Sequence, residues 1–251
     1  CFEFSAQAFD LAERLQTPVF VMTDLDIGMN TRLCDPLQWT DSRAYDRGKV
    51  MTHDELEAGK EFGRYLDVDG DGVPFRTYPG THPTRGAYFT RGTTKDRYAR
   101  YSEAGPDYVD NMQRLLRKFE TAKQLMPKPL LRPAAKPARF GAIYYGSTSP
   151  AMQEALDVLA MRGIHVNALR VRGFPFQDEL ADFVASHPWV FVIEQNRDAQ
   201  LKTLLVNEAK VNPSRLLSVL HYDGTPITAR FIVDQISQHA AARTVVPLKR
   251  V

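Results

Sequence analysis

The chain has 251 residues, of which 43% are hydrophobic and 25% charged, and its formal net charge is +2. This composition is typical of an ordinary globular protein of one or two domains, and the near-neutral charge argues against partners such as nucleic acid or an anionic membrane. Two cysteines are too few for a disulfide framework or a four-cysteine metal site, and no apolar run reaches the ~18–20 residues of a membrane span, so we expect a cytoplasmic, reducing location.

The first 30 residues predict a helix followed by a strand. The apolar positions of the helix, at residues 4–15, are Phe4, Ala8, Leu11 and Leu15. Pro18 ends the helix, and the apolar run at 19–22 predicts a strand buried on both faces of a parallel sheet. One helix and one strand cannot close a core, and the chain does not begin with Met. We therefore expect residues 1–30 to be the end of a domain whose body lies upstream.

Residues 31–138 predict a connector. Residues 31–105 lack periodicity and are rich in Gly, Asp, Arg, Thr, Tyr and Pro, and irregular stretches of this length are usually functional or covered by a partner. Residues 107–126 predict a helix with an apolar stripe and a solvated cationic face. The stripe holds Val109, Met112, Leu116 and Phe119, and the cations are Arg114, Arg117, Lys118 and Lys123. Four prolines at 127–137 predict a stiff extended linker, which we take as a domain boundary.

Residues 139–240 alternate strands and helices, which predicts an α/β domain with a parallel sheet and right-handed crossovers. The predicted strands are 140–145, 165–171, 190–193 and 216–221, and the predicted helices are 150–162, 177–186, 199–210 and 226–238. Ser149-Pro150 and Thr225-Pro226 each place a capping hydroxyl before a Pro at the first helical position, and Gly163 fits a left-handed C-terminal cap. Residues 241–251 are expected to be a tail.

Asp67–Gly72 resembles the start of a calcium loop, with acidic residues at alternate positions. Such a loop needs a bidentate Glu at position twelve, and that position is Tyr78. We predict an Asp/Gly turn, and leave open whether Asp67–Asp71 binds a cation.

The turns after the predicted strands form the edge where open parallel sheets bind ligands. The first of them lacks the G-x-G-x-x-G and G-x-x-x-x-G-K-[ST] patterns, which argues against a nucleotide-binding α/β protein. Four polar residues, 194–197, follow a buried strand directly. They fit either a solvated turn or a contact across a domain or subunit interface, and the residues leave both open.

The connector residues 76–93 crowd Arg, Thr, His and Gly into one loop, which is either a surface loop or an anion-facing site. The six histidines show no spacing of a helical metal site, so no metal site is predicted.

Several separated segments resemble one family in the same order. They are 1–4, 16–30 (QTPVFVMTDLDIGMN), 64–72 (RYLDVDGDG), 76–83, 86–91, 111–122 (NMQRLLRKFETA), 146–148, 192–197 (VIEQNR) and 221–231 (HYDGTPITARF). Together they are similar to the α subunit of 2-oxoacid:ferredoxin oxidoreductases, in the form in which γ and α segments are fused.

The resemblance implies a thiamine pyrophosphate enzyme that converts a 2-oxoacid and coenzyme A to acyl-CoA and passes electrons to ferredoxin, or runs in reverse. Thiamine pyrophosphate with Mg and the [4Fe-4S] cluster would be held mainly by a β subunit, in an (αβ)2 hetero-oligomer. Residues 1–30 would end the pyrimidine-side thiamine domain, 31–138 would be the connector, and 139–240 a transketolase-C-terminal-like domain. The family's main substrate and cofactor motifs would lie upstream, so no catalytic residue and no activity alone are expected.

The resemblance also implies a site. Arg76 would bind the substrate carboxylate, and Thr81 would shape the same pocket. The family pattern T-G-x-x-H-D is partly kept at Arg91–Asp96, where Gly92 and Asp96 fit and Lys95 replaces His.

Candidate contacts with coenzyme A or at an interface are Arg91, Gly92, Asp96, Glu194 and Asn196. The alternative function is a non-catalytic α/β module that docks subunits.

Overall fold

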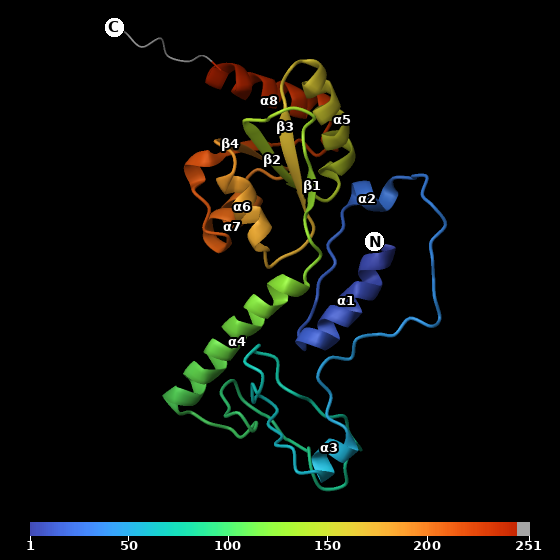
Figure 1. Ribbon diagram of the computed structural model, residues 1–251, viewed down its shortest axis with the longest axis vertical. Coiled ribbons are helices and arrows are strands. Elements are labelled where there is room, and N and C mark those ends of the chain that lie inside the picture. Colours follow the sequence, from blue (N-terminus) through green and yellow to red (C-terminus); the bar gives the residue numbers. More distant parts are fainter. Residues whose placement is uncertain (245–251) are drawn as a thin grey trace. The chain divides into compact units, whose positions relative to one another are not determined.

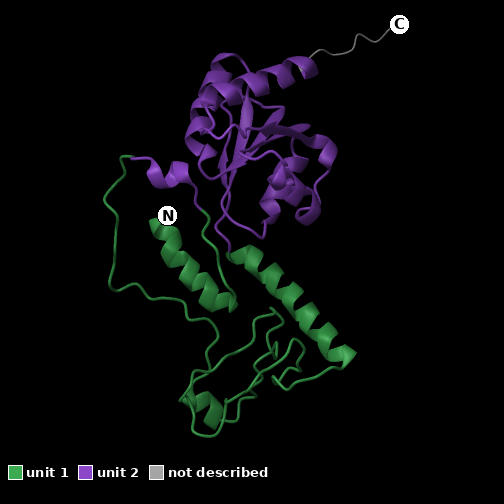
Figure 2. Ribbon diagram, turned by 180° about the vertical axis from the view of Figure 1, so that it is seen from behind, with its two compact units in different colours: residues 1–22, 32–125 green, residues 23–31, 126–251 purple. Residues whose placement is uncertain are grey.

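The computed structural model describes residues 1–244 and divides into two compact units (Figure 2). Unit 1 holds Cys1–Met22 and Arg32–Leu125, and unit 2 holds Thr23–Thr31 and the chain from Met126 onward. No helix among residues 1–244 is long and apolar enough to cross a membrane.

Unit 2 is built on a five-stranded sheet (Figure 1). The strands are β1 (Leu130–Arg132), β2 (Phe140–Tyr145), β3 (Val166–Val171), β4 (Trp189–Glu194) and β5 (Leu216–Leu220). Their order is β1-β3-β2-β4-β5, with β2 to β5 parallel and β1 antiparallel at the edge. The four strands predicted within residues 139–240 are therefore confirmed, as is the α/β fold class.

Helices cover both faces of this sheet, as Figure 1 shows. They are α5 (Thr148–Met161) and α8 (Ala229–Thr244) on one face and α6 (Asp178–Ala185) and α7 (Gln200–Glu208) on the other. The interior strand β4 is buried from both sides, and Val190–Ile193 have no exposed surface. A strand covered on both faces needs a continuous apolar run, which is the pattern that predicted it.

The details of unit 2 differ from prediction at β1, at the start of α5 and at the start of α8. The Pro-rich linker contains strand β1, because an edge strand tolerates proline at its ends. Helix α5 begins at Thr148, ahead of Ser149, because Gly146, with a φ of +58°, turns the chain directly after β2. The cap of α8 is Thr228, whose hydroxyl accepts from the Phe231 N–H at 3.2 Å.

Helix α8 also extends to Thr244, into the expected tail, while residues 245–251 lie outside the described part of the chain. Gly163 has a φ of +78° just after α5, so the predicted left-handed cap is confirmed.

Unit 1 contains the predicted first helix, α1 (Phe2–Leu15), and a long irregular connector with one short helix, α3 (His53–Glu57). The strand predicted at residues 19–22 is wrong. Phe20 and Met22 are more than 80% exposed, and no described segment pairs with this stretch. A parallel strand needs a neighbour for its backbone groups, and its apolar composition alone does not supply one.

Helix α4 (Gly105–Leu125) is present as predicted, but it turns the opposite face inward. Arg114 is 7% exposed and donates to the Gly72 carbonyl at 3.0 Å, while Leu116 and Phe119 are more than half exposed. The solvated cationic face that we predicted is therefore wrong for Arg114, because the Gly72 carbonyl gives its guanidinium a better partner than an apolar side chain could.

Gly72 allows this packing. Its φ is +78°, and a Cβ there would lie 2.3 Å from the backbone nitrogen of Lys118 on α4. Only a residue without a side chain lets the turn approach the helix this closely.

Candidate functional site

Arg76 is held in place through both its backbone and its side chain. Its N–H donates to the Lys49 carbonyl at 2.9 Å, and its carbonyl accepts from Met51 at 2.9 Å. The side chain is 16% exposed and forms an ion pair with Glu13 of α1. It also donates to the Arg47 carbonyl at 2.7 Å. Arg76 is thus anchored, and a ligand carboxylate would reach it by taking the place of Glu13.

Glu13 is the anion of this group. The hydrogen bond from Arg76, together with the charges of Arg76 and Arg47, holds the pKa of Glu13 below its ordinary value of 4.5. The Tyr78 hydroxyl accepts from Arg76 at 3.1 Å, and the Tyr78 ring lies 5.3 Å from the guanidinium carbon. A guanidinium beside an aromatic ring is suited to recognising a carboxylate. Here the carboxylate that it holds belongs to the chain itself, at Glu13.

Thr81 closes the turn that follows Tyr78. Its hydroxyl donates to the Tyr78 carbonyl at 2.8 Å, and its backbone N–H donates to the same carbonyl at 3.1 Å. Arg76 and Thr81 therefore lie in one loop, and the Thr81 hydroxyl has a partner inside that loop.

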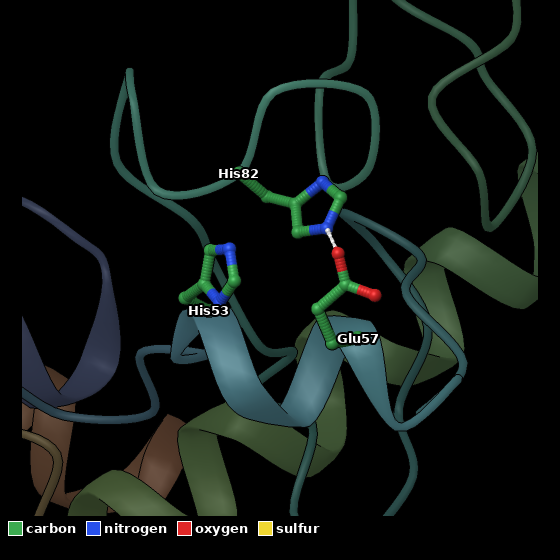
Figure 3. Close-up of side chains that lie close together, drawn as sticks. All are labelled: His53, Glu57 and His82. Atoms are coloured by element: carbon green, nitrogen blue, oxygen red, sulfur yellow. Dashed lines mark hydrogen bonds and ion pairs between the residues drawn. The ribbon is translucent and has the colours of Figure 1, made fainter.

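Three side chains of ligand type meet beside this loop, as Figure 3 shows: His53, Glu57 and His82. Their ligand atoms all lie within 4.8 Å of one another. His53 and Glu57 are one turn apart on α3, and His82 comes from the loop. This group was not predicted from the sequence, although the i, i+4 spacing of His53 and Glu57 was a signal for it.

The hydrogen bonds of His82 argue against a metal at this position. Its Nδ1 accepts from the backbone N–H groups of Thr84 at 3.1 Å and Arg85 at 2.9 Å. A ring nitrogen that accepts carries no proton, so the neutral ring is protonated at Nε2, which donates to Glu57 at 2.7 Å. A metal would need that Nε2 lone pair. The His82 side chain is 2% exposed, and the group fastens the loop to α3.

The stretch from Arg91 to Asp96 forms a second loop of unit 1. Gly92 lies against Tyr101, and a Cβ there would be 2.9 Å from the ring. The guanidinium carbon of the exposed Arg91 is 5.1 Å from the centre of the same ring. Asp96 accepts from the backbone N–H groups of Tyr98 at 2.9 Å and Arg100 at 2.8 Å, and so closes the turn that follows this stretch.

The Asp67–Asp71 segment is a turn, as predicted, and it has a cation of its own. The Lys49 ammonium lies 2.6 Å from the Asp69 carboxylate and 2.7 Å from that of Asp71, and it donates to a backbone carbonyl at 2.9 Å. Lys49 therefore supplies the positive charge that a metal ion would bring to these oxygens.

The crevice expected of such a sheet lies between the C-terminal ends of β2 and β4, where the strand order reverses. Gln195, after β4, donates to Ser147 at 3.0 Å and to Thr148 at 3.3 Å, both of which follow β2. Ser147 in turn donates to Asp24, the N-cap of α2 (Leu25–Met29). The chain's own side chains thus span the crevice.

Glu194 is fully buried at the end of β4. Its carboxylate accepts from the backbone N–H groups of Leu201 at 2.6 Å and Lys202 at 3.1 Å, and from the Asn196 side chain at 2.8 Å. The carboxylate therefore caps the first turn of α7. Asn196 accepts from the backbone N–H groups of Asp198 at 3.1 Å and Gln200 at 3.2 Å, where the chain enters α7. Both residues serve the local structure, and Glu194 has no exposed surface.

The search of protein-family models found no match for the chain. Among solved structures, the chain is similar to the 2-oxoglutarate:ferredoxin oxidoreductase from Magnetococcus marinus, whose structure contains 2-oxoglutarate, coenzyme A and succinyl-CoA. The TM-score is 0.76 at 19% identity, over 91% of this chain and 38% of that one.

Two further structures match more weakly. A split-gene transketolase gives a TM-score of 0.36 at 17% identity, over 44% of this chain and 41% of its own. The α chain of a probable 2-oxoacid ferredoxin oxidoreductase from Thermoplasma acidophilum gives 0.32 at 22% identity, over 45% of this chain and 97% of its own. Scores this low add no weight, so the established likeness is one of fold, to about 38% of the length of the Magnetococcus protein.

Proposed function

We propose that the chain is part of the α subunit, of the fused γ/α type, of a thiamine-dependent 2-oxoacid:ferredoxin oxidoreductase. The observation that carries the proposal is the fold match over 91% of the chain at a TM-score of 0.76. The ordered motifs of the sequence point to the same family. The reaction would convert a 2-oxoacid and coenzyme A to acyl-CoA with electron transfer to ferredoxin, or run in reverse.

The two cofactor groups do not fit the described residues. A [4Fe-4S] cluster takes four thiolates, whereas the sequence has two cysteines, which are both exposed. The acidic turn that would suit the Mg of thiamine pyrophosphate holds the Lys49 ammonium instead. The proposal therefore assigns the cluster and the pyrophosphate site to a β subunit in an (αβ)2 assembly.

Arg76 would bind the carboxylate of the 2-oxoacid, and Thr81 would keep the loop in shape. The supporting observation is the ion pair with Glu13, because it shows that the guanidinium already holds a carboxylate in this position. Exchange of Glu13 for the substrate carboxylate would keep the Arg76 guanidinium paired with one carboxylate.

The test is co-expression of the full-length subunit with its β partner, followed by an assay of dye reduction that depends on 2-oxoacid and coenzyme A. Arg76→Ala should raise the KM for the 2-oxoacid about tenfold or more, the effect of losing a charge-assisted contact. Arg43→Ala is the matched control, because Arg43 pairs with Asp10 of α1 at the surface. An unchanged KM would remove Arg76 from the site, and absence of 2-oxoacid-dependent reduction would overturn the function.

A second candidate function is a docking module without a ligand of its own. The observation that favours it is the crevice of unit 2, which Gln195, Ser147 and Asp24 span. In that case Arg76→Ala would leave both assembly with the partner and the KM of the complex unchanged.

A further inference from the structure

Cationic side chains surround Tyr65 in unit 1, between the connector and the covered face of α4. The Lys95 ammonium lies 5.2 Å from the centre of the Tyr65 ring, and the guanidinium carbons of Arg64 and Arg114 lie 5.4 and 5.6 Å from it. Lys118 follows Arg114 by one helical turn, close enough for the charges of Arg114 and Arg64 to act on it. We call Arg64, Lys95, Arg114 and Lys118 the cationic cluster.

The charges of the cationic cluster are compensated only in part within the described chain, by Asp67 and Asp110, which act on Arg114 from beyond ion-pair distance. Across residues 1–244, none of its four members forms an ion pair. The nearby carboxylates are used elsewhere: Asp67 pairs with Arg117 at 2.9 Å, and Asp110 pairs with Arg97 at 2.9 Å. The charges of Arg64, Arg114 and Lys118 thus act on one another, and Lys95 lies beside the same Tyr65 ring, while no carboxylate among residues 1–244 is paired with any of the four.

Burial makes this arrangement unfavourable unless an anion binds. Arg114 is 7% exposed, and its single hydrogen bond, to the Gly72 carbonyl, leaves the buried Nε without a partner. Burial and the charge of Arg64 lower the pKa of Arg114, and burial with the charges of Arg114 and Arg64 lowers the pKa of Lys118. A bound anion would satisfy the unpaired donor and reverse the repulsion.

We propose that the cationic cluster binds a phosphate group of a small anionic ligand. A phosphate group carries up to two charges on several acceptor oxygens, which suits four donors better than a single carboxylate does. The rings of Tyr65 and Tyr88, both beside Arg64, would flank the organic part of the ligand. The inference goes beyond the proposed function and does not depend on it. If that function holds, coenzyme A is one source of such a group, and free pyrophosphate is the other.

The test is calorimetric titration of the full chain with pyrophosphate and with adenosine 3′,5′-bisphosphate, at constant ionic strength. We expect saturable binding that weakens as salt rises, because the contacts are electrostatic. Lys118→Gln and Lys95→Gln should each raise the Kd about tenfold, whereas Lys118→Arg should keep it. If the bisphosphate binds more tightly than pyrophosphate, the ligand is of the nucleotide type. If the two bind equally, the ligand is a free phosphate compound such as pyrophosphate.

Lys123→Gln is the matched control, since Lys123 lies on the same helix and pairs with Glu120. In the unsubstituted chain, pyrophosphate should also protect Lys118 from acetylation and leave Lys123 reactive, a result that does not depend on variants folding. The proposal is overturned if neither anion binds, or if the Gln variants bind both anions as the unsubstituted chain does. It is also overturned if those variants lose only association with a partner subunit, because an acidic partner side chain would then be the occupant.

Discussion

Replacement of Glu194 by Ala removes the buried carboxylate that caps α7. Two backbone N–H groups, those of Leu201 and Lys202, then lose their acceptor, and so does the side-chain amide of Asn196. Each buried donor left unpaired costs about 1–3 kcal/mol, and the carboxylate also interacts with the helix dipole, worth about 0.3–2 kcal/mol. Because the buried carboxylate is itself costly to desolvate, the net loss should be about 3–5 kcal/mol.

For a unit of this size such a loss lowers the melting temperature by about 10 °C or more. Glu194→Gln keeps one acceptor oxygen, and should therefore lose about 1–3 kcal/mol. Glu208→Gln is the control, because Glu208 ends the same helix at its negative pole, where removal of a negative charge is neutral or slightly stabilising.

Thermal unfolding gives the stability of each variant, and hydrogen exchange at Leu201 and Lys202 locates the effect. A melting temperature within about 2 °C of the unsubstituted chain, with protected amides in Glu194→Ala, would refute the cap. Glu194 would then be retained for a contact outside the chain.

Two further substitutions test unit 1. Gly72→Ala should destabilise unit 1 more than Gly70→Ala does. Both glycines have a φ near +78°, but only a Cβ at position 72 would meet α4. Urea unfolding measures both losses of stability, and equal losses would show that the close approach at Gly72 is unimportant. Glu55 has its pKa lowered from 4.5 to about 2, first by the hydrogen bond from Lys60 and then by that of the Thr52 N–H. Its contribution to stability is therefore complete above about pH 4.5 and lost as pH falls toward 2, so the stability difference between Glu55→Gln and the unsubstituted chain should close over that window in denaturation curves. A difference that stays constant between pH 7 and pH 2.5 would contradict this assignment.

The sheet of unit 2 could be predicted because its strands are buried on both faces. A run such as Val190–Ile193 contains only apolar residues, as a strand covered on both faces requires. The regular alternation of strands and helices is compatible with few sheet topologies. Strand β1 could not be predicted, because an edge strand of three residues between prolines has no apolar pattern.

Helix α4 shows where periodicity stops being informative. The spacing of its apolar residues correctly predicts a helix with two faces, but it does not say which face the rest of the chain covers. Arg114 is buried because the Gly72 carbonyl meets it, and that carbonyl is placed by a turn 42 residues earlier.

The candidate site was predictable only in part. The motif singled out the loop of Arg76 and Thr81, whose role in a site stays a prediction. The partner of Arg76 was not foreseen, because it is Glu13, 63 residues away, on a helix interpreted from its apolar face alone. The cationic cluster could not be predicted for the same reason, since its members come from three separate stretches of sequence.

The short segment Thr23–Thr31 belongs to unit 2, although the residues before and after it belong to unit 1. The polypeptide therefore crosses between the units three times, and the bond from Ser147 to Asp24 joins residues 123 positions apart. Neither unit is a continuous cassette, so recombination with a single crossover cannot exchange one of them intact. A chimaera that replaces everything after Met126 would have to bring residues 23–31 with it, or rebuild the cap over the crevice from the host sequence.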